Sequence, residues 1–100
     1  MTDLSSLRYR IEDEAGRGRI VAESEAGGEA ELTFSKAGAS RIIADHTLVP
    51  DAMGGQGVGT ELVRRLRDYA LEHEVRVVAL CPFVKATMAR HPEWQDVLDR

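Results

Sequence analysis

A glycine run, Gly54-Gly55-Gln56-Gly57-Val58-Gly59, stands between a β-like segment at residues 41–49 and a helix-like segment at residues 58–73. Where a strand turns into a helix, several backbone N–H groups have no partner and lie at the positive end of the helix dipole. Because glycine has no Cβ atom, a phosphate can approach these groups directly. The run is therefore typical of a phosphorylated-ligand site, although a tight turn without a ligand also accounts for it. No Lys-Ser/Thr pair follows, which disfavours a nucleotide P-loop.

Two side chains are candidates for group or proton transfer, Cys81 and His46. Cys81 ends an apolar, strand-like segment and is either a small buried hydrophobe or a reactive thiol. A reactive thiol needs a lowered pKa. The start of the short helix expected at residues 83–90 could lower the pKa of Cys81. His46 is a candidate base that would remove a proton from a substrate ammonium. Strand alternation places it on the face of Ile42 and Ala44, which favours a buried, hydrogen-bonded histidine instead.

These residues are positioned by two differently patterned halves of the chain. The first half reads as strands separated by turns, with an acidic, glycine-containing loop at 12–18 and a Gly27-Gly28 hairpin turn. The strands are expected at residues 7–11, 19–25, 30–34 and 41–49. In the second half, apolar residues recur at helical spacing, namely Val58, Leu62, Val63, Leu66, Tyr69 and Ala70.

A buried strand at residues 75–81 and a short helix at 83–90 follow the helix 58–73. A strand, a helix and a strand with these connection lengths form a crossover, so the strands 41–49 and 75–81 are expected to be parallel. The expected fold is one α/β (α+β) domain over residues 7–98. Its mixed sheet has about five strands, with an antiparallel N-terminal half and one βαβ crossover that carries the glycine loop.

Composition and charge narrow the classes of function. The net charge of −4 disfavours binding along a nucleic-acid backbone, and suits a cationic amine. Arg64 and Arg65 are explained as surface charges by the i,i+4 pairs Arg64–Asp68 and Glu61–Arg65. With a single cysteine, neither a disulfide nor a CxxC metal pair is expected. The longest apolar run is too short to span a bilayer and the first residues show no secretory signal, so a cytoplasmic location is expected.

The order of these elements, with a glycine loop between a strand and the crossover helix, resembles the GCN5-related N-acetyltransferases. In their acetyl-CoA loop pattern the two closing glycines correspond to Gly57 and Gly59, whereas Gly54 stands where the pattern has Arg or Gln. Three further segments look like the small subgroup of about a hundred residues in this superfamily. These are His46-Thr47-Leu48-Val49-Pro50, Leu80-Cys81-Pro82-Phe83-Val84 and His91-Pro92-Glu93-Trp94.

The resemblance implies a function and a set of contacts. Acetyl-CoA would be the co-substrate, with no metal, and an amine of unknown identity, including a protein or peptide amine, the acceptor. The implied cofactor-binding residues are Leu48, Val49, Gly54, Gly55, Gln56, Gly57, Val58, Gly59 and Thr60. Pantetheine would pair with the strand at Leu48 and Val49, and the pyrophosphate would lie on the loop amides. Cys81 corresponds to a cysteine proposed as catalytic in the subgroup. A coenzyme A or acyl-CoA binding module without turnover is the alternative.

Overall fold

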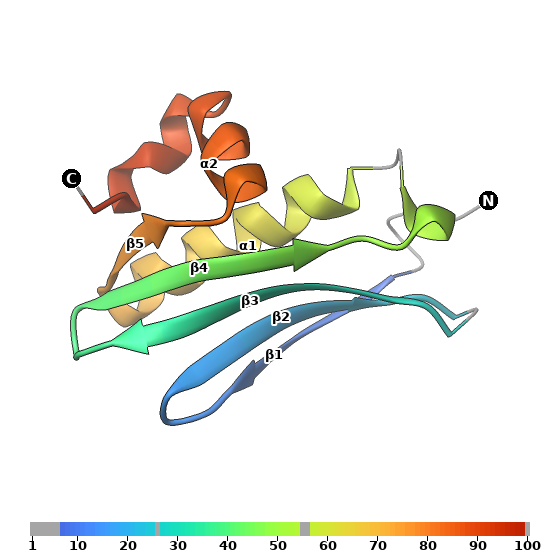
Figure 1. Cartoon of the computed structure of the whole chain (residues 1–100), viewed down its shortest axis with the longest axis horizontal. Coiled ribbons are helices and arrows are strands. Elements are labelled where there is room, and N and C mark those ends of the chain that lie inside the picture. The colour runs from blue at the N-terminus through green and yellow to red at the C-terminus, as the bar shows by residue number, and fades with distance from the viewer. Residues whose placement is uncertain (1–6, 26, 55–56, 100) are drawn as a thin grey trace.

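The computed structural model describes residues 7–25, 27–54 and 57–99. One sheet and its covering helices make up this part of the chain (Figure 1). In chain order the elements are β1 Arg8–Asp13, β2 Arg17–Glu23, β3 Glu29–Ala37, β4 Arg41–Leu48, a 3-10 turn η2 Asp51–Met53, α1 Val58–His73, β5 Arg76–Ala79, α2 Pro82–Ala89 and a 3-10 segment η3 Pro92–Val97.

The strands form one sheet in the order β1-β2-β3-β4-β5. The first four pair antiparallel through short turns, and β5 returns parallel to β4 after the crossover helix α1. Glycines with positive φ allow two of these turns, Gly27 at 97° and Gly38 at 76°. The expected α+β fold, its mixed sheet and its single crossover are confirmed.

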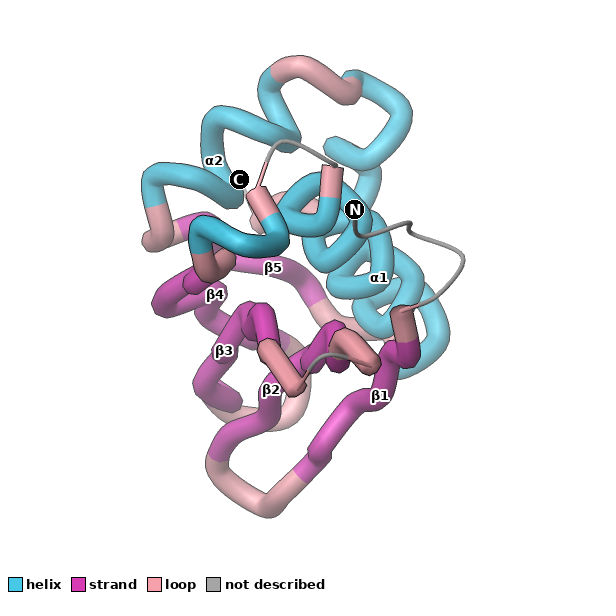
Figure 2. Tube along the Cα trace, turned by 90° about the vertical axis from the view of Figure 1, so that its right-hand side faces the viewer, coloured by secondary structure: helices cyan, strands magenta, loops and turns pink. Residues whose placement is uncertain are grey.

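The helices gather on one face of the sheet (Figure 2). The helical spacing of α1 is confirmed in full, because every residue of its predicted apolar face is buried. This face covers alternate side chains of the sheet, namely Ile20, Ala22, Ala30, Leu32, Phe34, Ile42, Ala44 and Val77. Burial of these side chains stabilises the domain by removing apolar surface from water. The opposite face of the sheet carries mainly polar and charged side chains, as a sheet with one covered face does, although Val21 on this face is fully buried.

A β-bulge interrupts the alternation of β4. Thr33 of β3 pairs with His46, but the next residue of β3, Phe34, pairs with Ala44, so Asp45 is an extra residue. The extra residue shifts the phase of the strand. Ala44 therefore faces the core while His46 faces the solvent-exposed side of the sheet, where it is exposed. The prediction that His46 is buried beside Ile42 and Ala44 is wrong, because simple alternation does not anticipate a bulge.

Two boundaries also differ from the sequence prediction. The hairpin between β1 and β2 is longer than expected, since β1 continues to Asp13 and β2 begins at Arg17, within the predicted loop at 12–18. The last strand is shorter than the predicted 75–81 and is only partly buried. Its core-facing Val77 is fully buried, but Leu80 just beyond it is 67% exposed. As the edge strand that runs directly into α2, β5 has a helix over one face only.

The C-terminal segment closes the free edge of β5. Leu98 forms a parallel bridge with Val77, and the N–H of Asp99 donates to the Val77 carbonyl. His91 precedes η3 and stacks on Trp94 with their ring centroids 4.0 Å apart. Among the described residues, none of the helices combines the length and the apolar composition that crossing a bilayer requires.

Candidate active site

The first turn of α1 presents unpaired backbone donors. Gly57 precedes the helix in the left-handed conformation, with φ 78°, and its carbonyl accepts the first intrahelical hydrogen bond from the Glu61 N–H. No side chain caps this end of the helix. Among the described residues, none supplies a partner for the N–H groups of Val58, Gly59 and Thr60, which a capping residue or an earlier turn would otherwise provide. Such a helix start is suited to an anion.

A pocket of about 330 Å³ lies at this helix start. Its lining residues are Val49, Asp51, Met53, Gly54, Gly57, Val58, Gly59, Thr60 and Phe83. The structure thus brings together six of the residues predicted to bind cofactor. Leu48 does not line the pocket and its side chain is 52% exposed, although its backbone directly precedes Val49. Gly55 and Gln56, which belong to the same prediction, lie outside the described residues.

Three walls of the pocket were missed by the sequence reasoning. Asp51 and Met53 come from the 3-10 turn η2, and Phe83 comes from the first turn of α2. Phe83 sits so close to Gly59 that a Cβ atom there would lie 2.6 Å from the ring. Gly59 is therefore needed for the close approach of the two helix starts. An aromatic residue directly after Pro82 is the one signal that could have pointed to this wall.

No basic side chain lines the pocket in the part of the chain that the structure describes, and Asp51 is its one ionisable lining residue. The nearby arginines of α1 are engaged elsewhere. Arg64 pairs with Glu61 and Asp68, and Arg65 pairs with Glu61 at 2.8 Å. The ion pairs predicted from the sequence are thus confirmed. Binding of an anion in this pocket would rest on the backbone N–H groups of α1.

Next to the pocket, the pairing between β4 and β5 ends early. The ladder runs from Arg41 to Ala44 of β4, and the N–H of Cys81 then donates to the Ala44 carbonyl at 2.8 Å. From residue 45 to Leu48, β4 continues along β3, and none of the backbone hydrogen bonds found among the described residues joins it to β5. We call this stretch, residues 45–48, the open edge of β4.

Cys81 lies beside the open edge, at the N-terminus of α2. Its side chain is 6% exposed, as the buried reading of this cysteine predicted. Its Sγ is 3.5 Å from the Thr47 Oγ1, and no capping hydrogen bond joins the side chain to α2. Thr47 pairs with Leu32, a core residue, so the thiol lies on the helix-covered side of β4.

Opposing influences act on the Cys81 thiol. Burial raises its pKa, because a thiolate loses hydration in the interior. The N–H groups of Val84 and Phe83 and the hydroxyl of Thr47 outweigh burial and leave the pKa below its usual value. Since no capping hydrogen bond is formed, the two helix N–H groups act on the sulfur mainly as dipoles. The start of the helix after Cys81, predicted as a source of a lowered pKa, is thus among the influences that act on the thiol.

His46 and Cys81 lie on opposite faces of the sheet, although both belong to the same short stretch of the fold. His46 pairs with Thr33, whose hydroxyl donates to the His46 carbonyl at 3.5 Å on the solvent-exposed face. On that face the hydroxyl of Ser35 donates to the bulged Asp45 at 2.6 Å. The two candidate residues therefore flank the open edge of β4 from its two sides.

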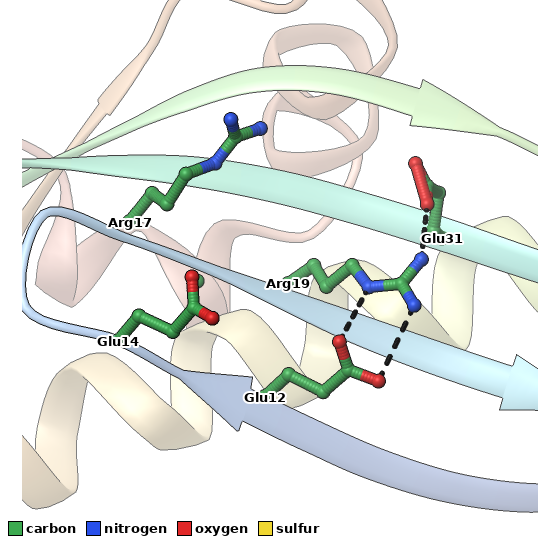
Figure 3. Close-up of a pocket in the computed structure, with 6 residues that line it drawn as sticks. Glu12, Glu14, Arg17, Arg19 and Glu31 are labelled. Atoms are coloured by element: carbon green, nitrogen blue, oxygen red, sulfur yellow. Dashed lines mark hydrogen bonds and ion pairs between the residues drawn. The ribbon is translucent and has the colours of Figure 1, made fainter.

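A second hollow of about 330 Å³ lies on the solvent-exposed face of the sheet, over β1 and β2 (Figure 3). Arg19 stands at its centre and donates to Glu12 on one side and to Glu31 on the other, with shortest distances of 2.7 Å. The charges of Arg19, Glu12 and Glu31 therefore pair with one another, and these ion pairs link β1, β2 and β3. The described residues contain no group of three or more His, Cys, Asp or Glu side chains arranged to hold a metal ion.

Comparison with known proteins agrees with this geometry. Residues 17–97 match the family model described as GCN5-related N-acetyl-transferase. Among solved structures, the chain is similar to the NMR solution structure of a GCN5-like candidate N-acetyltransferase from Staphylococcus aureus. The sequence identity is 29% and the TM-score 0.69, and the match covers 99% of this chain and 91% of the other. No curated protein matches the sequence.

Proposed function

The chain belongs to the GCN5-related N-acetyltransferase family, and we propose that it transfers the acetyl group of acetyl-CoA to an amine. The observation that carries this proposal is the pocket at the start of α1, which joins unpaired amides, Val49 at the end of β4 and Phe83 of α2. The pyrophosphate of coenzyme A binds to the N–H groups of the first turn. The pantetheine arm pairs with the backbone of Leu48 and Val49 and leads the thioester toward the open edge of β4.

The reaction uses groups on both faces of the sheet, Cys81 on the helix-covered side and His46 on the solvent-exposed side. The amine nitrogen, freed of one proton, attacks the thioester carbonyl carbon and forms the new C–N bond. A backbone N–H at the open edge donates to the developing oxyanion. The C–S bond then breaks, the leaving coenzyme A thiolate takes a proton, and the nitrogen of the new amide loses its remaining extra proton, which restores the Cys81 thiol through solvent. Cys81 donates this proton from the helix-covered side, because a thiol with a lowered pKa gives up its proton readily.

The acceptor approaches from the solvent-exposed face, where His46 removes the proton of the substrate ammonium. Of the five pockets identified among the described residues, none is lined by Asp45, His46 or Thr47. A side chain presented by a protein or peptide can reach such an open site without being enclosed. We therefore favour a protein or peptide amine over a small molecule that requires a deep pocket.

Incubation with acetyl-CoA and a panel of amines and lysine peptides tests the proposal. We expect coenzyme A release, measured by chromatography, that depends on an amine. Intact-mass measurement of the protein shows whether Cys81 itself carries an acetyl group during turnover. Tight coenzyme A binding with no release across the panel would favour the alternative, a coenzyme A or acyl-CoA binding module in which Cys81 is only structural.

Replacement of Gly54 by arginine is expected to tighten coenzyme A binding about fivefold, the scale of one partly exposed ion pair. The backbone there has φ −73°, which any residue adopts, and a Cβ atom would lie 3.4 Å from the Asp51 carbonyl oxygen, an ordinary contact. Calorimetric titration with coenzyme A measures the change. Gly54→Leu is the matched control without charge, and equal affinities for the two variants would contradict a phosphate at this position.

Replacement of His46 by glutamine is expected to flatten the rise of kcat/KM with pH, because the amide cannot take a proton from the acceptor. Cofactor affinity should stay unchanged, since His46 lies on the face away from the pocket. Steady-state rates over a pH series measure the effect. A pH profile identical to that of the parent protein would remove His46 from the reaction.

A further inference from the structure

The Cys81 sulfur lies where neutral hydrogen-bond donors from two elements converge. From β4 come the hydroxyl and the N–H of Thr47, and from the first turn of α2 come the N–H groups of Val84 and Phe83. The hydroxyl is the one side-chain group of this set, with Oγ1 and Sγ 3.5 Å apart, a normal separation for a hydrogen bond to sulfur in which either atom can donate. Because Cys81 is only 6% exposed, its sulfur has little access to water as an alternative partner.

The bulge at Asp45 is what places Thr47 beside the sulfur. Without the extra residue, the alternation that puts Ile42 and Ala44 on the covered face would put His46 there and turn Thr47 to the solvent. With it, Thr47 pairs with the core residue Leu32 and faces the start of α2. The strand therefore places the Thr47 hydroxyl, rather than the His46 imidazole, beside Cys81.

No charged side chain is among the dominant influences on the thiol. The titratable residues of the adjoining elements lie apart from it. On β4, Asp45 and His46 are exposed, with Asp45 hydrogen-bonded to Ser35 on the far face, and on α2 the Lys85 side chain is exposed. The state of the sulfur is thus set by neutral dipoles, and the Thr47 hydroxyl is the one that a substitution can remove without disturbing the backbone.

We propose that Thr47 is a positioning residue for Cys81, whose hydroxyl donates to the sulfur and holds it at the open edge of β4. This role rests on the proposed function, because a fixed sulfur matters only if Cys81 takes part in acetyl transfer. In that reaction Thr47 touches neither acetyl-CoA nor the acceptor. It orients the thiol toward the leaving group and stabilises the thiolate that remains after the proton has been given up.

Thr47→Val removes the hydroxyl and keeps the volume and branching of the side chain, and Thr47→Ser keeps the hydroxyl. The pKa of the thiol is measured from the ultraviolet absorbance of the thiolate, with Cys81→Ala protein as the blank, because Cys81 is the single cysteine. Tyrosine absorbance interferes little, since burial raises the pKa of both tyrosines, that of Tyr69 to about 12. Thr33→Val, the same change on the other face of the sheet, is the matched control.

We expect the thiol pKa to rise by about one unit in Thr47→Val, the scale of one lost hydrogen bond to a thiolate. The thiol pKa should return to the parent value in Thr47→Ser and stay at the parent value in Thr33→Val. A folded Thr47→Val protein with the parent thiol pKa would overturn the proposal. If Thr47→Val does not fold, Thr47→Ala against Thr47→Ser gives the same comparison.

Turnover provides the second measurement. Thr47→Val should lower kcat about tenfold with an unchanged KM for acetyl-CoA, and Thr47→Ser should restore it. A shifted thiol pKa with the parent kcat would refute a role in the reaction. Absence of turnover in the parent protein would refute the proposed function instead, and the thiolate titration would still decide whether Thr47 holds the sulfur.

Discussion

Replacement of Cys81 by alanine is expected to lower turnover roughly a hundredfold, the usual cost of removing a positioned proton donor. The thiol lies at the open edge of β4, where the coenzyme A thiolate would leave in the proposed reaction, and its pKa is below the usual value. Without it the thiolate leaves unprotonated or takes a proton from water. Coenzyme A release under saturating acetyl-CoA and acceptor measures the loss, and calorimetric titration should show unchanged coenzyme A affinity.

The same variant separates catalysis from packing. Loss of the buried sulfur should cost about 1 kcal/mol of stability through a small cavity. A thiol whose pKa is lowered by folding adds stability above its unfolded-state pKa and loses it as the pH falls through the folded-state pKa. The difference in melting temperature between parent and Cys81→Ala should therefore grow as the pH rises through this window. Retained turnover with a lowered melting temperature would mean that Cys81 is a core residue only.

Replacement of Gly57 by glutamate should weaken coenzyme A binding by a hundredfold or more. A carboxylate at the start of α1 would meet the pyrophosphate at close range, where like charges repel by roughly 3–4 kcal/mol near a protein surface. It would also occupy the space that leads to the unpaired N–H groups of Val58 and Gly59. Calorimetric titration of the folded variant with coenzyme A measures the effect.

A substitution at Gly57 also needs a control for backbone strain, because a φ of 78° costs a non-glycine residue about 1–2 kcal/mol. Gly38 has φ 76°, also with no atom within 4 Å of an added Cβ, and lies at the other end of β4. Gly38→Glu should therefore lose similar stability and keep coenzyme A affinity, whereas Gly57→Gln isolates the charge. Coenzyme A binding by Gly57→Glu at the parent affinity would remove the phosphate site from the start of α1.

Helix α1 illustrates what local pattern can predict. Its apolar spacing follows from burial of one face on a sheet, so six residues of the sequence specify the helix, its orientation and its core contacts. The glycines at its start were equally informative. Gly57 needs its left-handed backbone, a conformation that the residue type itself favours, whereas the need for a missing Cβ at Gly59 comes from the approach of Phe83.

His46 shows where such reasoning fails. The bulge that turns it to the solvent depends on how β4 aligns with β3, and neither strand alone specifies that alignment. The walls of the pocket at the start of α1 could not be predicted for a similar reason. Asp51 and Phe83 are more than thirty positions apart in the chain, and their meeting at the start of α1 is decided by how α2 packs on the sheet. Contacts between distant elements leave no periodic trace in the sequence.

The bulge at Asp45 has a consequence for the order of events in the proposed reaction. Because it sets Thr47 and Cys81 on one side of β4 and His46 on the other, cofactor and acceptor would have separate entrances in the proposed reaction. Under this proposal neither would have to leave before the other arrives, which predicts a ternary complex. Spent coenzyme A can also be exchanged while an acetylated protein chain is still docked, which would permit several lysines of one partner to be modified in a single encounter.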